Sequence, residues 1–288
     1  MAEREHAVMA PRKEDIRSKV AAIEDLPTLP PVVAALREIL AEPETVVDDI
    51  AQLISRDPAL SANFLRLVNA PFYGFPGRIA SVHHALVLAG SNVAKAIASS
   101  TTVCAVPEAL MVGLWEHCLG VALTSRLLAE RLGVRDADEI MAAGLLHDLG
   151  KVVLHVAFAD EAERAYQLAA ERGILIVEAE REILDVDHAE IGQWVARSWN
   201  LPTVLRDPIA YHHDPFLSKN GTVGTAIVHF ADILVRALDF GNPGDNLVPP
   251  LRGEAWHRLG LSEEDLRNVV NDVDNELSVT GTTLFRAT

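Results

Sequence analysis

Several kinds of residue are scarce in this chain, and each scarcity excludes a class of protein. The two cysteines, Cys104 and Cys118, are too few for a disulfide framework, so we expect them to pack in the core of a protein from a reducing compartment. Aromatic residues make up only 5% of the chain. Sheets use more aromatic and β-branched residues than this, whereas helices do not need them. The sequence therefore predicts a nearly all-α protein.

Long apolar runs are absent as well. The first residues are charged and contain no apolar stretch of the kind found in signal peptides. No later segment reaches the roughly 18 uninterrupted apolar residues of a membrane helix. We expect a cytoplasmic protein without a membrane partner.

Positive charge is the third shortage. The chain has 25 Lys and Arg against 41 Asp and Glu, which gives a formal net charge of −16. A surface that binds nucleic acid needs clustered Lys and Arg to neutralise phosphates, so this balance argues against a nucleic-acid partner. A small anionic ligand would need a local positive charge, which a bound divalent cation can supply.

Apolar residues are plentiful, at 49% of the 288 residues, and can fill a sizeable core. Prolines and capping residues mark the helix starts. They predict helices over about 13–23, 30–41, 58–68, 82–89, 92–104, 114–132, 137–148, 188–201, 202–213, 222–238 and 263–273. Three starts resemble capping boxes, at Asp136/Glu139, Asp187/Glu190 and Ser262/Asp265. We divide the chain into a loose leader (1–12), an N-terminal helical part (13–106), a helical bundle (107–240), and an irregular loop with a C-terminal helix (241–288).

Histidines and aspartates recur along the predicted bundle, around the adjacent pair His147-Asp148. The candidate metal ligands are His117, His147, Asp148, His188, His212, His213 and Asp232. Imidazole and carboxylate ligands together suit first-row divalent metals, and the absence of cysteine disfavours a structural zinc knot. We predict one or two divalent ions, with Fe or Mn favoured and Zn or Co as alternatives.

Each of these residues also has an ordinary interpretation. A single histidine usually packs in the core or faces solvent, and we interpret the following in that way: His6, His83, His84, His155 and His257. His229 shares a helix face with Asp232, and we interpret it as a hydrogen-bond partner of a ligand or as an extra ligand, ranked below Asp232. Lys151, one turn after Asp148, is a candidate for neutralising a substrate phosphate. Its ordinary role would be a favourable cation at a helix C-terminus.

The order His117, His147-Asp148, Asp232 resembles the ligand order of the HD superfamily of metal-dependent phosphohydrolases. The additional His188 and the pair His212-His213 resemble the second-metal ligands of its HD-GYP branch, which hydrolyses cyclic di-GMP. By that resemblance Asp148 bridges two metals. His117, His147 and Asp232 hold one of them, and His188, His212 and His213 hold the other.

The chain as a whole is most similar to the HDOD family of bacterial signal-transduction output domains, which are related to HD-GYP proteins. The similar segments are 26–30, 57–60, 67–70, 84–90 and 144–151. This resemblance implies an HD-like helical bundle packed against an N-terminal helical subdomain. The residues after His213 do not contain the Gly-Tyr-Pro signature, which argues against cyclic di-GMP as a substrate.

Two functions follow as hypotheses. The first is a signalling output module with a metal centre that hydrolyses a nucleotide or another phosphoester, with Asp148 and Lys151 as its catalytic residues. The second is an inactive scaffold in which the same residues hold a structural ion or form a hydrogen-bond network. Because no receiver or sensor domain is recognisable, we expect the input to come from a partner, a ligand or transcriptional context, which the sequence does not distinguish. A signalling protein is the expected partner in both hypotheses. The oligomeric state stays open.

Overall fold

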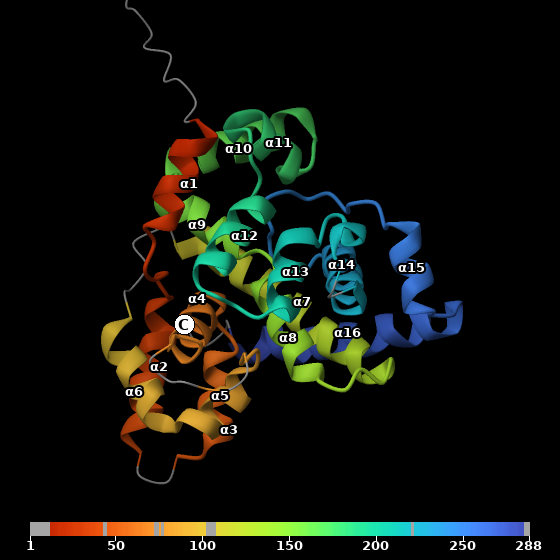
Figure 1. Cartoon of the computed structure of the whole chain (residues 1–288). Coiled ribbons are helices and arrows are strands. Elements are labelled where there is room, and N and C mark those ends of the chain that lie inside the picture. The colour runs from red at the N-terminus through yellow and green to blue at the C-terminus, as the bar shows by residue number, and fades with distance from the viewer. Residues whose placement is uncertain are drawn as a thin grey trace, which may run out of the picture.

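The structure is a computed structural model that describes residues 12–42, 45–71, 75, 78–101, 108–219 and 222–284. Within these ranges every regular element is a helix, as predicted (Figure 1). The elements are α1 (Lys13–Ala21), α2 (Pro30–Ala41), α3 (Val47–Ile54), α4 (Pro58–Val68), α5 (Val82–Ala89), α6 (Ser91–Ser100), α7 (Glu108–Arg131), α8 (Ala137–Leu146), α9 (Leu149–Ala157), α10 (Ala159–Arg172), α11 (Ile176–Leu184), α12 (His188–Ser198), α13 (Thr203–Tyr211), the short 3-10 helix η2 (Pro215–Leu217), α14 (Thr222–Ala237), α15 (Gly253–Leu259) and α16 (Glu263–Leu284).

The helices form two groups that share one hydrophobic core. Helices α2 to α6 gather at the lower left of Figure 1, and the later helices pack around α7 and α8. Helix α1 lies with the second group, against α12 and α9. Buried side chains from Ile16 in α1 to Leu277 in α16 belong to one continuous cluster. The described N-terminal helices are therefore part of the same folded unit as the bundle.

A buried carboxylate joins the two groups. Asp57 accepts a hydrogen bond from the Leu60 backbone N–H (2.7 Å) and so caps α4, as the sequence predicts. It also accepts one from Trp115 Nε1 of α7, at 2.7 Å. Trp115 lies two residues before His117, so this contact ties the N-terminal helices to the helix that carries a candidate ligand.

The other predicted helix starts have mixed outcomes. Ser81 caps α5, Asp187 caps α12, and Ser262 and Asp265 form reciprocal hydrogen bonds at the start of α16. The prediction of a capping box at Asp136 is wrong, because the Asp136 side chain makes no hydrogen bond to the start of α8. Helix α6 ends at Ser100, earlier than predicted, and Cys104 lies outside the described residues, as does most of the predicted leader. Cys118 is fully buried, in agreement with a packing role.

The apolar sequence between Ala137 and Ala157 is an interior segment. It is the one stretch of the described chain that is long and apolar enough to cross a membrane, but 83% of its most apolar window is buried inside the protein. Helices α8 and α9 in this stretch are separated by His147 and Asp148. The break in the helix turns both side chains toward the same interior point.

Two glycines let neighbouring helices approach this break closely. A Cβ atom on Gly144 would lie 2.7 Å from Ser125 Oγ and 2.9 Å from the Val121 carbonyl oxygen of α7. A Cβ atom on Gly150 would overlap the carbonyl oxygen of His188 at the start of α12. Backbone atoms cannot move aside as a flexible side chain can, so larger residues would push these helices apart.

We expect Gly150→Ala to lower the free energy of unfolding by about 1–3 kcal/mol, the usual cost of overpacking a core. Gly253→Ala is the matched control, because a Cβ there meets no atom within 4 Å. The control variant should stay within about 1 kcal/mol of the wild type, or gain stability. Urea unfolding measures both. Equal stability of the two variants would contradict the close approach of α9 and α12.

Candidate metal centre

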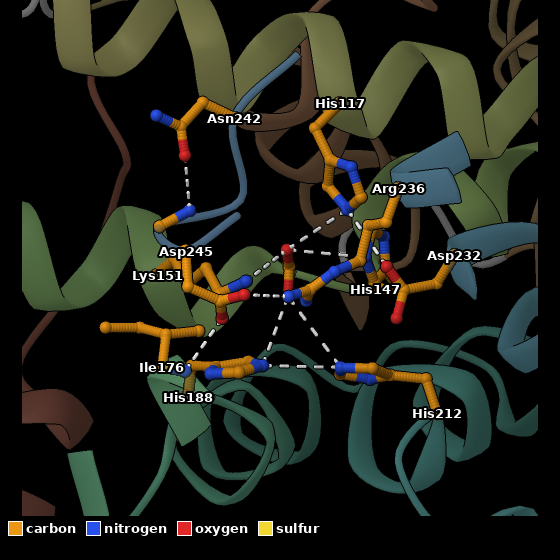
Figure 2. A network of polar contacts seen from close by, with 12 residues as sticks. His117, His147, Lys151, Ile176, His188, His212, Asp232, Arg236, Asn242 and Asp245 are labelled. Carbon is orange, nitrogen blue, oxygen red and sulfur yellow. Dashed lines mark hydrogen bonds and ion pairs between the residues drawn. The ribbon is translucent and has the colours of Figure 1, made fainter. Parts of the chain in front are cut away.

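The seven predicted ligands come together in the interior of the helical bundle. They are His117 of α7, His147 and Asp148 between α8 and α9, His188 at the start of α12, His212 and His213 after α13, and Asp232 of α14. Figure 2 shows the imidazole rings of four of them pointing toward one another. All except the half-buried His213 are at most 2% exposed.

Asp148 stands at the middle of the cluster, and its two carboxylate oxygens face different groups of residues. Oδ2 lies 3.3 Å from His147 Nε2 and 3.7 Å from His117 Nε2. Oδ1 lies 3.2 Å from His188 Nε2 and 3.7 Å from His212 Nε2. The carboxylate therefore separates two neighbouring sets of ligand atoms. We name them the Oδ2 side (His117, His147 and Asp232) and the Oδ1 side (His188, His212 and His213).

The Oδ2 side combines histidine with carboxylate. His117, His147 and Asp148 each place one ligand atom within 4.8 Å of the others. Asp232 adds a second carboxylate, since its Oδ1 lies 3.2 Å from His117 Nε2. This side therefore offers two nitrogen and two oxygen ligands.

The Oδ1 side is rich in histidine. His188 Nε2 lies 2.8 Å from His213 Nε2 and 3.3 Å from His212 Nε2, and the three rings form a second group with metal-ligand spacing. Metal–nitrogen bonds of about 2.0–2.1 Å place the ligand atoms of one ion roughly 3 Å apart, so this spacing suits a shared cation. Asp148 Oδ1 supplies the oxygen atom of this set.

Hydrogen bonds on the far side of three rings orient them. His147 Nδ1 donates to the Gly144 carbonyl oxygen (2.8 Å) and His212 Nδ1 donates to the Pro208 carbonyl oxygen (3.0 Å). His188 Nδ1 lies 2.6 Å from Glu180 Oε2. A carbonyl or a carboxylate can only accept, so Nδ1 of each ring carries a proton, and in the neutral form of the ring Nε2 presents a lone pair to the centre.

Burial and charge set the protonation of the ligands. Burial lowers the pKa of His117 and of His213, and lowers the pKa of His212 to about 3, so these rings are neutral at neutral pH. For His147, burial also lowers the pKa, but the charge of Asp148 outweighs it and the pKa is raised.

For the two carboxylates, Asp148 and Asp232, interactions with neighbouring residues outweigh burial and lower the pKa. Burial raises the pKa of Asp148, but the charges of His147 and Lys151 outweigh it and hold that pKa well below its usual range. Burial likewise raises the pKa of Asp232, but the close approach of His117 outweighs it and the pKa is held well below its usual range. Ionised carboxylates and neutral imidazoles are the forms that bind metal ions.

Lys151 lies inside the centre. Its Nζ donates to Asp148 Oδ2 at 2.7 Å, and the side chain is 2% exposed. It therefore neutralises the central carboxylate in this structure, which is a different contact from the substrate phosphate that we considered for it. Lys151 is the third residue of α9, so it does not lie at a helix C-terminus, which was its ordinary interpretation.

Buried atoms without partners show that a cation fits this centre. His117 Nδ1 and Nε2, His147 Nε2 and Asp148 Oδ1 make no hydrogen bond of normal geometry although all are buried. Buried polar atoms in proteins are nearly always paired, so the unpaired His117 Nε2, His147 Nε2 and Asp148 Oδ1, which lie close together, indicate ligands for an ion. The nitrogen and oxygen atoms suit divalent Fe, Mn, Zn or Co.

The other histidines that the structure describes lie outside the ligand set, and His6 lies outside the described residues. His229 donates from Nδ1 to the His212 carbonyl oxygen (2.6 Å), and its Nε2 accepts from the Arg252 backbone N–H (3.1 Å). Both ring nitrogens are thus engaged with backbone, and His229 supports the position of His212. His155 is packed in the interior and His83 lies near Asp48 at the surface.

Glu180 is a functional residue that the sequence reasoning missed. It is 3% exposed and binds both the ring and the backbone N–H of His188. The available signal was an acid at a core position, four residues after Ile176 and four before Leu184, both of which are buried. Helix α11 was not among the predicted helices, so that position could not be recognised.

Comparisons with known proteins show what this chain is similar to. The chain is 28% identical to an uncharacterised protein of Treponema pallidum over 93% of its length, and spans about half (54%) of that relative. It is 32% identical to ribonuclease Y of Thermus thermophilus over 51% of its length, which covers 20% of that enzyme. The solved structure of the MmoQ response regulator of Methylococcus capsulatus has 25% identity and a TM-score of 0.66, covering 86% of this chain and 99% of the regulator.

The family match extends over most of the described helices. The HDOD domain model matches residues 26–215, from the segment before α2 to the residues that follow the histidine pair after α13. The all-helical fold is that of the regulator structure. This chain therefore belongs to the HDOD family.

Proposed function

We propose that this chain is a signal-transduction output module whose buried centre holds two divalent metal ions, one on each side of Asp148. The arrangement of the Asp148 carboxylate carries the proposal, because its two oxygens face separate groups of imidazole nitrogens. Similarity to a response regulator over nearly the whole length of that structure supports a place in signalling. The upstream signal would come from a partner protein.

Phosphoester hydrolysis is the second candidate function. When bound, such ions polarise phosphoryl oxygens and lower the pKa of water, which is the chemistry that this hydrolysis uses. The protein's own part would be to hold the ligand lone pairs and to keep Lys151 next to the central carboxylate. Relationship to a protein named ribonuclease Y over half of the chain supports this candidate.

The burial of the centre favours the output module over the hydrolase. Lys151 and the ligands other than His213 are at most 2% exposed, so a phosphoester could approach the described residues only at the His213 edge. A phosphodiester backbone would also meet a chain with a formal net charge of −16. The ions would then stabilise the bundle and the surface that the partner recognises.

Metal analysis tests the proposal. Protein purified anaerobically should contain about two divalent ions per chain by elemental mass spectrometry, as in two-metal centres. His117→Ala and His188→Ala should each lose about one ion, because they remove a nitrogen from opposite sides of Asp148. His83→Ala, at the surface, is the control. Wild-type protein with near-zero metal would contradict the proposal.

An activity assay on the same samples separates the two candidates. Metal-loaded protein is incubated with bis-p-nitrophenyl phosphate, cyclic di-GMP and a short RNA. Turnover that disappears in His117→Ala would establish the hydrolase. Turnover indistinguishable from that of this variant would leave the output module as the function.

A further inference from the structure

We infer that Glu180, which lies outside the predicted ligand set, is the positioning residue of the Oδ1 side and sets its affinity for metal. This inference rests on the proposed function, because it concerns one of the two ions proposed there. Glu180 binds His188 twice: Oε2 lies 2.6 Å from Nδ1 and accepts the His188 backbone N–H at 2.9 Å. The ring therefore cannot rotate without losing a buried hydrogen bond.

The first consequence concerns the proton of His188. The carboxylate of Glu180 accepts a hydrogen bond, so the ring proton is placed on Nδ1 and Nε2 carries the lone pair. Nε2 lies 3.2 Å from Asp148 Oδ1 and 2.8 Å from His213 Nε2. Glu180 thus directs the lone pair of His188 to the point where the other ligands of the Oδ1 side meet.

The second consequence concerns charge. His147 and His212 donate to neutral backbone carbonyls, whereas His188 donates to an acid. The Oδ2 side has a second carboxylate in Asp232, but the Oδ1 side has only one oxygen of Asp148 among its ligands. A carboxylate behind a ligating imidazole raises its basicity and offsets the charge of the metal. Glu180 supplies that charge on the side that lacks it.

The surrounding structure holds Glu180 in place. The next residue, Arg181, donates from Nε to Asp187 Oδ2 at 2.8 Å, which clamps α11 to the start of α12. At the other end of α11, Asp245 accepts the Ile176 backbone N–H at 2.7 Å and pairs with Arg236 of α14 (Figure 2). The start of the helix that carries Glu180 is therefore linked through Asp245 to α14, the helix that carries Asp232.

Cobalt titration of three variants tests the inference. Co²⁺ alone is added to metal-free protein in competition with a chelator, and visible absorption reports each binding step. Glu180→Ala should weaken one of the two steps about 10–100-fold and leave the other unchanged. Glu180→Gln keeps an oxygen that accepts from Nδ1 and should weaken that step less. Glu182→Gln is the matched control, since Glu182 is on the same helix but exposed and paired with Arg172.

The outcomes are distinguishable. Two binding steps of wild-type strength in Glu180→Ala would overturn the inference while the proposed function stands. If both binding steps weaken equally, and in proportion to a loss of thermal stability in both Glu180 variants, Glu180 has only a structural role. That result would also overturn the inference. Wild-type protein that binds no Co²⁺ would overturn the proposed function, and the inference with it.

Discussion

Replacement of Asp148 by alanine is expected to lower the free energy of unfolding by about 3–5 kcal/mol even in metal-free protein. The reason is Lys151, whose Nζ lies 2.7 Å from Asp148 Oδ2 while both side chains are at most 2% exposed. Without Asp148 the ammonium group is buried with no opposite charge against it, or must lose its proton. Metal binding should be lost at the same time, because both sides of the centre use this carboxylate.

A double variant separates folding from metal binding in this experiment. Asp148→Ala with Lys151→Met removes both charges and should recover most of the lost stability, since a buried ion pair contributes little over an apolar pair. It should still bind no metal. Glu130→Ala is the control, because its exposed pair with Arg126 contributes at most about 1 kcal/mol. Urea unfolding and metal analysis report the two properties. If metal-free Asp148→Ala is as stable as the wild type, Lys151 is not held by this pair.

The second large effect is expected from Asp245→Ala, at about 3–5 kcal/mol of unfolding free energy. Asp245 and Arg236 form an ion pair in which each side chain is 4% exposed. Asp245 also accepts the backbone N–H groups of Ile176 and Leu247, so its loss leaves a buried guanidinium without its opposite charge and the start of α11 without its acceptor. The loop between α14 and α15 would lose this link to α11, while Arg236 Nε keeps its hydrogen bond to the Leu247 carbonyl oxygen.

An exposed pair provides the comparison for Asp245. Arg172 and Glu182 are both about half exposed, at 53% and 49%. Glu182→Ala should therefore change stability by less than about 1 kcal/mol. The double variant Asp245→Ala with Arg236→Met should be at least as stable to unfolding as Asp245→Ala alone, because it no longer contains the uncompensated charge of Arg236. Similar losses of unfolding free energy in Glu182→Ala and Asp245→Ala would show that burial of the ion pair does not cause the large effect expected for Asp245.

Contacts with the protein backbone position the ligands of the centre. Several ligands, among them His147, His188 and His212, lie at helix ends that are positioned by a backbone hydrogen bond or by a close approach at a glycine. Such contacts are stiff, because a buried backbone group that loses its partner costs about 1–3 kcal/mol. A change in metal occupancy would therefore be transmitted to the helices that carry the ligands.

Local sequence signals were sufficient for much of the fold. Pro30, Pro58 and Ser81 mark helix starts because the missing N–H or the capping oxygen acts within one turn. The helices α3, α9, α10, α11 and α15 were not predicted, and α11 has no conventional side-chain cap, since its N-cap is Leu175. At Asp136 the residue types were right for a capping box, but the backbone there does not direct the side chain to the helix start.

The candidate ligands could be read from residue types, order and family resemblance, because those properties are local. The amino-acid sequence alone determined a helical chain with a His/Asp series suited to divalent metals. Only the tertiary structure decided that the two oxygens of Asp148 face different histidines, that Lys151 is internal, and that Glu180 stands behind His188. These facts depend on distances between residues far apart in sequence, which packing of the helices determines and no local pattern encodes.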